Sequence, residues 1–400
     1  MSFLYEKSEV EHVIRLVADR MIADTSHAFV NSKSGAVIQS LDGVEASPDI
    51  WLQSGYEDWK YWNGVNNIAF FRMSALLEDE SYKKYVLKNF DFIFDNLPFF
   101  EQQFQDFEPE SYAPNYHQYF RVDRLDDCGA MDGSLIEASA FKQDKRWSKR
   151  LERVTEWMRS GQDRTDNGIF CRNYKGYTTL WADDVYMSVP FLVRMGEKFG
   201  DSSFWDDAIK NTLGFHDILF DKNKGLYWHS YCQQLGVPGV AHWGRANGWS
   251  IVAKCDLLEY IPENYPGREK VKEALFEQIV GLSRYQSANG MWRQLLDKTD
   301  SFLETSGTAM FTYGVAKAVN EGWIPELYSS IAINGWRGIV GNIRPDGQVA
   351  NISEGFNIRQ DLSYYYNRPR PLNDPHGLGA VLLAGVEIYK MKDYQDYMWY

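Results

Sequence analysis

Apolar residues recur at helical spacing in six separated stretches of the chain. The first stretch, residues 8–23, places Val10, Ile14 and Val17 on one face and polar residues on the other. The same pattern returns at 82–95, 146–160, 203–220, 268–285 and 325–340. Helices with one apolar and one polar face are typical of a layer in contact with water. We therefore predict six outer helices.

A second kind of stretch follows each of these six, after a long connection. It is less polar, richer in small residues and apolar on most sides, which is typical of buried helices. These stretches begin at Trp62-Asn63-Gly64-Val65, Asp126-Asp127-Cys128-Gly129, Asp183-Asp184-Val185-Tyr186, Arg245-Ala246-Asn247-Gly248, Glu304-Thr305-Ser306-Gly307 and Pro375-His376-Gly377-Leu378. Their starts are roughly 55–70 residues apart, as in a helix-pair repeat.

Alternating outer and inner helices predict the fold. Six of each close into an all-α (α/α)6 barrel, with the less polar helices around the axis. Residues 1–400 contain no Pro/Gly/Ser-rich linker, so we expect one barrel domain over the whole chain. Two separate helical domains are the alternative.

The connections differ in length at the two ends of this barrel. Turns from inner to outer helices are short, as at 78–81, whereas connections from outer to inner helices are long. The long connections carry turn signals that favour short β-hairpins, at Asp166-Asn167-Gly168, Asn223-Lys224-Gly225, Asn289-Gly290 and Asp346-Gly347. Long loops in compact domains are usually functional. The mouth of the active site is therefore predicted at the end where the inner helices begin.

Carboxylates stand at the start of several predicted inner helices. Asp183 and Asp184 open the third, Asp126 and Asp127 the second, and Glu304 the fifth. An acid in the first helical turn is favourable because free N–H groups accept it, so capping alone is the structural alternative. Acids gathered at a barrel axis repel one another and are partly desolvated. Both effects raise the pKa of at least one acid toward the range of a general acid.

Aromatic residues are abundant, at 16 % of the chain with 14 Trp and 25 Tyr. Their rings stack on the C–H faces of sugars, although they also fill cores. The predicted mouth gathers Tyr61, Trp181, His229, Trp243, Asn247 and Trp249. Arg245, between two of these tryptophans, suits a bidentate contact to a substrate carboxylate. These residue types favour a small anionic oligosaccharide as the ligand.

Charge and motif content exclude several other classes. A net charge of −13 argues against nucleic acid and anionic membranes as partners. The sequence has no zinc or EF-hand spacing, no P-loop and no dinucleotide-binding glycine run, so we predict no metal and no cofactor. Four cysteines without paired spacing and an N-terminus without an apolar core favour a cytoplasmic protein, or a periplasmic one if a signal peptide has been removed. Both a monomer and a homodimer remain open.

Two runs of residues resemble a known family. They are Leu180-Trp181-Ala182-Asp183-Asp184-Val185-Tyr186-Met187 and His242-Trp243-Gly244-Arg245-Ala246-Asn247-Gly248-Trp249, supported by Asp126-Asp127-Cys128-Gly129 and Glu304-Thr305-Ser306-Gly307-Thr308-Ala309. Together they are similar to glycoside hydrolase family 105, the unsaturated rhamnogalacturonyl hydrolases, which is related to the unsaturated glucuronyl hydrolases of family 88. The resemblance covers about residues 62–320.

The resemblance implies a hydrolase that removes a terminal 4-deoxy-hex-4-enuronic acid from lyase-generated oligosaccharides, with the unsaturated rhamnogalacturonan disaccharide from pectin as first choice. In such enzymes an Asp protonates C4 of the double bond and water adds at C5. By motif, the proton donor falls on Asp183 and a supporting acid on Asp127. Arg245 and Trp249, and less closely His229 and Trp243, carry over as substrate contacts.

Three other functions stay open at this point. An inverting glycosidase on the same barrel would use Asp127 as base and Asp183 as acid, roughly 6.5–9.5 Å apart. A sugar epimerase would rely on paired histidines at the axis, and the seven histidines are too scattered to favour it. A non-enzymatic sugar-binding protein would keep the aromatic residues without needing Asp183.

Overall fold

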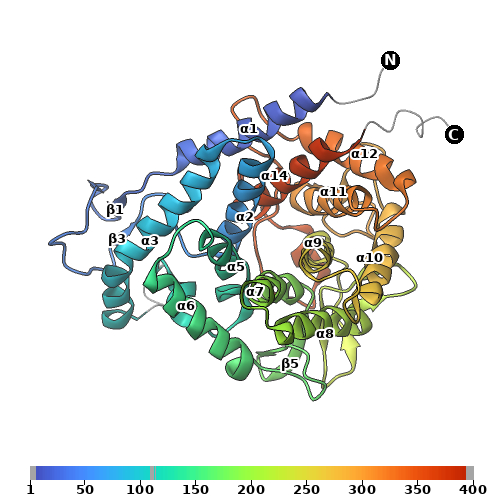
Figure 1. The fold of residues 1–400 in the computed structure, drawn as a ribbon, viewed down its shortest axis with the longest axis horizontal. Helices are drawn as coiled ribbons and strands as arrows, with labels where there is room; N and C mark the ends of the chain where they lie inside the picture. Colours follow the sequence, from blue (N-terminus) through green and yellow to red (C-terminus); the bar gives the residue numbers. More distant parts are fainter. Residues whose placement is uncertain (1–5, 109–111, 113, 393–400) are drawn as a thin grey trace.

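Six inner helices form a closed ring in the computed structural model, which describes residues 6–108, 112 and 114–392. Each inner helix contacts the next, and the last contacts the first (Figure 1). They are α2 (Tyr61–Leu76), α5 (Gly129–Ala138), α7 (Asp183–Phe199), α9 (Gly244–Tyr260), α11 (Thr305–Asn320) and α14 (Pro375–Lys390). Their starts coincide with the predicted openings within a few residues.

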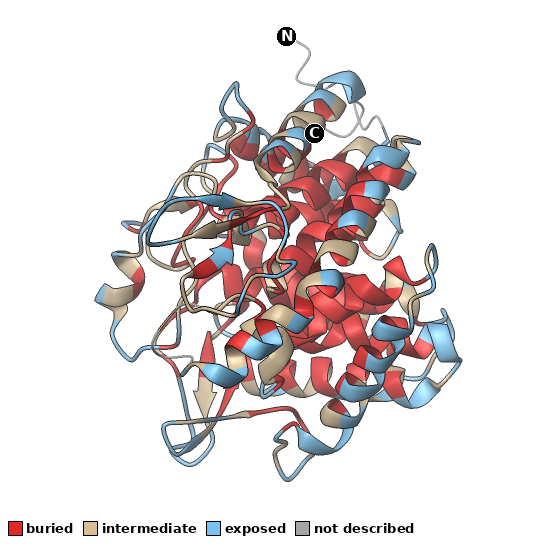
Figure 2. Ribbon diagram, turned by 90° about the vertical axis from the view of Figure 1, so that its left-hand side faces the viewer, coloured by how far each residue is buried: buried red, intermediate tan, exposed pale blue. Residues whose placement is uncertain are grey.

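Six outer helices surround this ring. They are α1 (Lys7–Asp24), α3 (Glu80–Asp106), α6 (Lys145–Glu156), α8 (Ser202–Leu219), α10 (Arg268–Ser283) and α12 (Ser329–Val340). The inner helices are buried along most of their length, whereas the outer helices expose one face (Figure 2). The predicted all-α (α/α)6 barrel is confirmed. Short helical segments lie in the connections: α4 (His117–Arg121), η2 (Leu125–Asp127), η3 (Trp157–Gly161), η4 (Glu326–Tyr328) and α13 (Leu362–Tyr366).

Small residues let the inner helices approach closely. A Cβ added to Gly129 of α5 would lie 1.6 Å from the carbonyl oxygen of Met187 in α7. Only glycine fits where two helix backbones meet at this distance. The small residues that mark the inner helices in the sequence therefore reflect the packing around the axis.

The second outer helix is longer than the stretch 82–95 that the sequence predicted. In the structure α3 continues through Pro98 to Asp106. Proline normally stops a helix, yet Pro98 lies inside α3. Phe100 and Gln103 beyond it are buried, and this packing outweighs the hydrogen bond that Pro98 cannot donate.

Short antiparallel strands occupy the long connections at the mouth. One sheet has the order β2-β1-β3, from β1 (Phe29–Asn31), β2 (Val37–Ile38) and β3 (Ile50–Leu52). A four-stranded sheet has the order β4-β5-β8-β9, from β4 (Arg172–Tyr174), β5 (Tyr177–Trp181), β8 (Ser230–Cys232) and β9 (Val237–Pro238). Two further pairs are β6 (Phe220–Asp221) with β7 (Leu226–Tyr227), and β10 (Trp292–Arg293) with β11 (Leu303–Glu304).

The predicted turns are only partly hairpins. Residues 223–225 join β6 to β7 as predicted, while the turns at Gly168 and Gly347 close single bridges. The Asn289-Gly290 turn does not join two paired strands, because β10 pairs with the later β11. Gly290 packs instead against α12, where an added Cβ would lie 1.9 Å from the carbonyl oxygen of Asn334.

Within the described residues, no helix is both long enough and apolar enough to cross a membrane.

Candidate active site

The candidate site is a cavity of about 430 Å³ at the mouth, where the inner helices begin. Residues from several connections and helix starts converge on it: Tyr61, Trp62, Gln118, Arg121, Arg124, Asp126, Arg172, Trp181, Asp183, Met187, Trp243, Gly355, Phe356, Asn357 and His376. Aromatic rings, carboxylates and guanidinium groups thus share one space of the size of a small sugar ligand.

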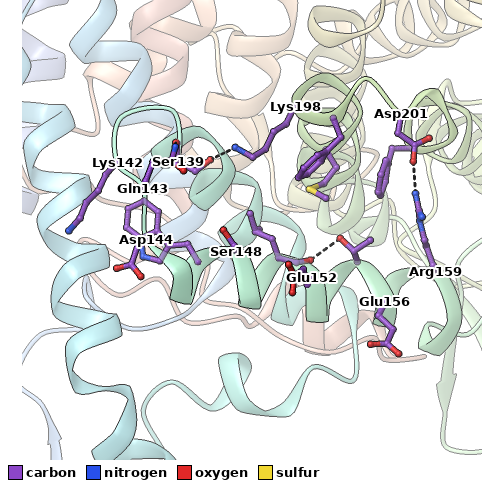
Figure 3. Close-up of a pocket in the computed structure, with 16 residues that line it drawn as sticks. Ser139, Lys142, Gln143, Asp144, Ser148, Glu152, Glu156, Arg159, Lys198 and Asp201 are labelled. Carbon is purple, nitrogen blue, oxygen red and sulfur yellow. Dashed lines mark hydrogen bonds and ion pairs between the residues drawn. The ribbon is translucent and has the colours of Figure 1, made fainter.

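A larger cavity of about 600 Å³ lies elsewhere, between α6 and the adjoining ends of α7 and α8 (Figure 3). Two pairs of its polar groups contact one another, Arg159 with Asp201 and Lys198 with Ser139. None of the acids at the inner helix starts reaches it. The mouth cavity is therefore the candidate site.

Asp183 lies at the first position of α7 and lines the cavity. Its Oδ2 atom is 3.2 Å from Nε2 of His229, and neither atom has a well-aligned hydrogen-bond partner in the described part of the chain. Burial acts to raise the pKa of Asp183, but His229, and then Arg172, hold it below its ordinary value. The pairing of β5 with β8 brings the two side chains together, because Trp181 stands opposite Ser230.

The adjacent acid, Asp184, has a different environment. It is fully buried and accepts hydrogen bonds from Arg172, with Nε 2.9 and 3.0 Å from its two oxygens. Arg172 also donates to Asp126 Oδ2 over 2.9 Å and stacks on the ring of Trp181. Burial raises the pKa of Asp184 to about 6, against the lowering effect of Arg172. Asp184 and Arg172 thus form a buried support that orients Asp126 and Trp181.

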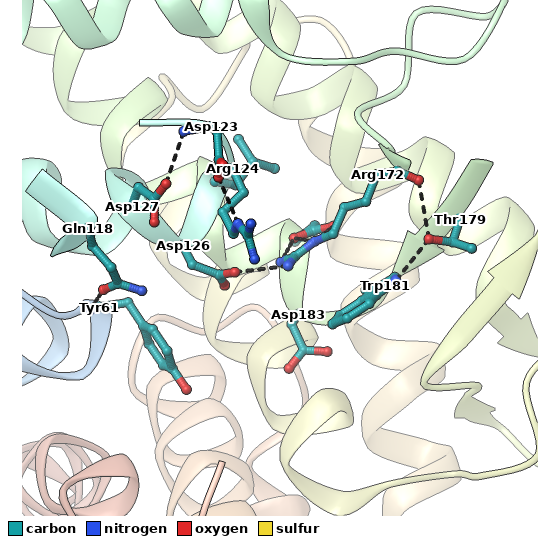
Figure 4. A network of polar contacts seen from close by, with 12 residues as sticks. Tyr61, Gln118, Asp123, Arg124, Asp126, Asp127, Arg172, Thr179, Trp181 and Asp183 are labelled. Carbon is teal, nitrogen blue, oxygen red and sulfur yellow. Dashed lines mark hydrogen bonds and ion pairs between the residues drawn. The ribbon is translucent and has the colours of Figure 1, made fainter. Parts of the chain in front are cut away.

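Asp127, predicted as the supporting acid, does not line the cavity. Its side chain is fully buried and ion-paired with Arg121, and it accepts the N–H of Asp123 over 3.0 Å. Figure 4 shows Asp126 directed toward Arg172, whereas Asp127 points away toward Asp123. This corrects the sequence prediction: of the adjacent pair in η2, Asp126 faces the cavity.

Three of the predicted substrate contacts line the cavity: Tyr61, Trp181 and Trp243. Trp181 is fixed by its indole N–H, which donates to Thr179, and Trp243 by donation to Gln294. Hydrogen bonds at the ring edges leave the aromatic faces available for stacking on a sugar.

Asn247 and Trp249 lie deeper and do not line the cavity. Asn247 exchanges hydrogen bonds with the backbone of Tyr227, accepting its N–H over 2.7 Å and donating to its carbonyl over 2.9 Å. Trp249 stacks on Tyr186 with ring centroids 4.8 Å apart. The predicted substrate contacts of both residues are not supported by these positions. Each joins an inner helix to a neighbouring element instead.

Arg245 is buried, and both of its terminal nitrogens have backbone partners. Nη1 donates to the carbonyl of Ser353 over 2.5 Å and Nη2 to that of Glu354 over 2.9 Å. Only Nε is without a partner in the described part of the chain. The two terminal nitrogens that a bidentate contact to a substrate carboxylate would need therefore already donate to backbone carbonyls. Arg245 holds residues 351–374, which we call the mouth strap, over the barrel.

Several cavity residues were missed by the sequence analysis. Arg172, Arg124 and Arg121 precede inner helix starts but belong to no motif, and Phe356 and Asn357 lie on the mouth strap, far along the chain from the acids. Glu304, by contrast, proves to be a helix cap, since it accepts the N–H groups of Ser306 and Gly307. Arg172 lies seven residues before Thr179, its partner in the pairing of β4 with β5. Because such a pairing has no fixed spacing in the sequence, it offered little signal for Arg172.

A family model described as Glycosyl Hydrolase Family 88 matches residues 43–392 of this chain. The chain belongs to this family. The resemblance to family 105 together with the related family 88 is confirmed. Among the residues described, no group of three or more His, Cys, Asp or Glu side chains is arranged to hold a metal ion.

Curated relatives are distant. An unsaturated rhamnogalacturonyl hydrolase, YesR, of Bacillus subtilis is 28 % identical over 53 % of this chain and 60 % of its own length. An unsaturated 3S-rhamnoglycuronyl hydrolase of Alteromonas sp. is 28 % identical over 52 % of this chain and 50 % of that protein. A protein of the same name from Formosa agariphila is 23 % identical over 92 % of both chains. The chain thus spans 60 % and 50 % of the length of the first two.

Solved structures share the fold over nearly the whole chain. A possible family 105 member from Salmonella enterica has a TM-score of 0.77 at 23 % identity, covering 96 % of this chain and 95 % of its own. The unsaturated glucuronyl hydrolase of Bacillus sp. GL1 has a TM-score of 0.66 at 13 % identity, covering 95 % and 96 %. At these identities the likeness establishes the barrel alone.

Proposed function

We propose that this glycoside hydrolase removes a terminal 4,5-unsaturated uronic acid from oligosaccharides left by polysaccharide lyases. One observation carries the proposal. Among the described residues, Asp183 is the cavity acid without an arginine partner, whereas Asp126, Asp127 and Asp184 are each ion-paired with an arginine. An acid that gives and takes a proton must not be held in its charged form by an arginine. The names of the curated relatives support the same substrate class.

The proposed chemistry is hydration of the C4=C5 double bond. Asp183 donates its proton to C4, water adds to C5, and the proton lost by that water returns to Asp183. The resulting hemiketal opens and releases the remaining sugar. His229 holds the pKa of Asp183 low in the free enzyme. A bound anionic uronate adds a like charge and excludes water, and both raise that pKa toward the range of a general acid.

Asp126 takes the supporting role in this proposal in place of Asp127. It lines the cavity, and Arg172 fixes its carboxylate at 2.9 Å. A carboxylate held this way can accept a hydrogen bond from the attacking water or from a sugar hydroxyl. No second cavity acid free of arginine stands opposite Asp183 among the described residues, and this disfavours an inverting glycosidase.

Arg124 is the guanidinium group best placed to meet the substrate carboxylate. It lines the cavity and is 44 % exposed, and in the described part of the chain it hydrogen-bonds only through Nε, to Asp123 over 2.8 Å. Its two terminal nitrogens remain for a bidentate contact, unlike those of Arg245.

Replacing Arg124 by Gln is expected to raise KM for an unsaturated disaccharide about tenfold and to change kcat little. A charge-assisted hydrogen bond contributes about 1.5–3 kcal/mol to the free energy of binding. This contact would be present equally in the ground state and the transition state, so its loss affects KM and not kcat. Initial-rate kinetics test this. Arg146→Gln, a change at an exposed outer-helix arginine, is the matched control. An equal KM in the Arg124 variant and the control would contradict the assignment.

The function itself is tested with lyase-generated unsaturated disaccharides from pectin, ulvan and glycosaminoglycans. Loss of the ultraviolet absorbance of the double bond is the expected result, first for the rhamnogalacturonan disaccharide. Saturated disaccharides of the same sequence serve as the control and are expected to remain intact. Cleavage of the saturated substrates at constant absorbance would replace the proposal by an inverting glycosidase. Inertness toward every substrate would refute the hydrolase proposal for this substrate class.

A further inference from the structure

A tyrosine on the mouth strap reaches His229 from the side opposite Asp183. The Oη atom of Tyr365 lies 2.8 Å from Nδ1 of His229, whose Nε2 is 3.2 Å from Asp183. Tyr365 and His229 are each 1 % exposed. The three side chains form a row that runs from the buried Tyr365 and His229 to the partly buried Asp183 in the cavity.

The imidazole ring cannot easily turn in this row. The backbone of His229 is held on both sides. Its backbone N–H donates to the carbonyl of Ala241, and its backbone carbonyl accepts the N–H of Ala182, next to Asp183, each over 2.9 Å. Trp243 and Tyr365 pack against the ring, with centroids 4.7 and 5.6 Å away. The two ring nitrogens therefore keep separate partners.

Hydrogen-bond donors and acceptors then fix the proton positions. Tyr365 has one hydrogen to give, and burial raises the pKa of its phenol, so it stays protonated. The backbone N–H of Arg359 approaches Oη at 3.4 Å as a donor and cannot accept that hydrogen. Nδ1 of His229 is the acceptor in reach within the described residues. In a neutral imidazole whose Nδ1 accepts, Nε2 carries the proton.

We propose that Tyr365 is a positioning residue that holds neutral His229 as its Nε2–H tautomer, with the N–H facing Asp183. The inference rests on the proposed function. After Asp183 has given its proton to C4, its carboxylate faces this N–H and is stabilised until the proton of the attacking water returns. The opposite tautomer would turn a lone pair toward the carboxylate and repel it.

The mouth strap is built to keep Tyr365 in place. The carbonyl of Tyr365 accepts from Gln294 over 3.4 Å, the same Gln294 that accepts the indole N–H of Trp243. Phe356 of the strap packs on Trp243 with centroids 4.3 Å apart, and Arg245 holds the strap from below. Gln294, Phe356 and Arg245 thus together fix the position of Tyr365 beside His229.

Tyr365→Phe removes only the hydroxyl group and tests the inference. We expect kcat to fall about tenfold with KM within about twofold of wild type, since the lost interaction acts on the charge formed during reaction. The apparent pKa of the acid in the pH profile of kcat/KM should rise, because the carboxylate loses a stabilising donor. Tyr364→Phe removes a hydroxyl from the same short helix α13 outside the row and is expected to behave as wild type.

The tautomer is measured directly by nitrogen NMR of ¹⁵N-histidine-labelled full-length protein, with the His229 signals assigned by their loss in His229→Gln. Protonated Nε2 in wild type, and a mixture of tautomers in Tyr365→Phe, would support the inference. Protonated Nδ1 in wild type, or identical spectra for wild type and Tyr365→Phe, would overturn it. The NMR spectrum reports the tautomer without turnover. A wild type inactive on every disaccharide would therefore refute the proposed function, whereas the spectra alone decide the tautomer of His229.

Discussion

Asp183→Asn is expected to lower kcat/KM for the unsaturated disaccharide by about 10³-fold or more. The amide matches the carboxylate in size but cannot give a proton to C4 or recover one from water. Because Asp183 is only partly buried at the start of α7, and makes no ion pair with an arginine, the fold should not depend on its charge. Loss of ultraviolet absorbance measures the rate, and thermal unfolding checks the fold.

Asp126→Asn is the matched comparison, since it changes another cavity carboxylate in the same way. We expect a smaller fall, about tenfold, because Asp126 orients water or sugar hydroxyls through a position that Arg172 fixes. Asp127 does not itself line the cavity, so Asp127→Asn should act through stability and through its ion-pair partner Arg121, which does. If Asp126→Asn abolished activity while Asp183→Asn retained it, the proton donor would have to be reassigned.

The barrel could be predicted because its signals are local and repeated. Helical periodicity separates outer from inner helices, and small residues such as Gly129 follow from close packing around an axis. The predicted end of α3 at residue 95 was wrong, because the helix continues through Pro98 and buries Phe100 beyond it. Local rules yield to tertiary packing at this point.

The site was harder to predict, for a different reason. Asp126 and Asp127 are adjacent, so only the backbone of the η2 turn decides which carboxylate faces the cavity. Asn247 has the residue type of a sugar contact, yet its amide satisfies the backbone of Tyr227. Tyr365 reaches His229 across 136 positions of sequence. Motifs identify residue types near a site, whereas orientation and long-range partners depend on the whole fold.

A buried ion pair beneath the site is expected to dominate the stability of this part of the barrel. Asp132 of α5 and Arg150 of α6 are fully buried and 2.9 Å apart. Arg150 also donates to the carbonyls of Tyr119 and Asp127, over 2.7 and 3.0 Å. The pair therefore joins an outer helix, an inner helix and the turn that carries Asp126.

Asp132→Asn is expected to lower the free energy of unfolding by about 3–5 kcal/mol, because Arg150 would remain buried without a counter-charge. Denaturant unfolding at pH 8 measures this, since burial raises the pKa of Asp132 to about 6 and the carboxylate is charged at that pH. Asp144→Asn is the control. Asp144 pairs with the exposed Arg146 and caps α6, and asparagine keeps the cap, so we expect a loss below about 1 kcal/mol.

A double variant that removes both charges separates two contributions to the free energy of unfolding: the penalty for a buried, unpaired arginine and the net stabilisation by the ion pair. The double variant Asp132→Leu with Arg150→Met should be more stable than Asp132→Asn alone, since no unpaired charge remains buried. It should still fall short of wild type, because the carbonyls of Tyr119 and Asp127 lose their donor. A double variant less stable than the single one would mean that Arg150 acts mainly through those carbonyls, as the brace that holds the η2 turn and Asp126 in the cavity.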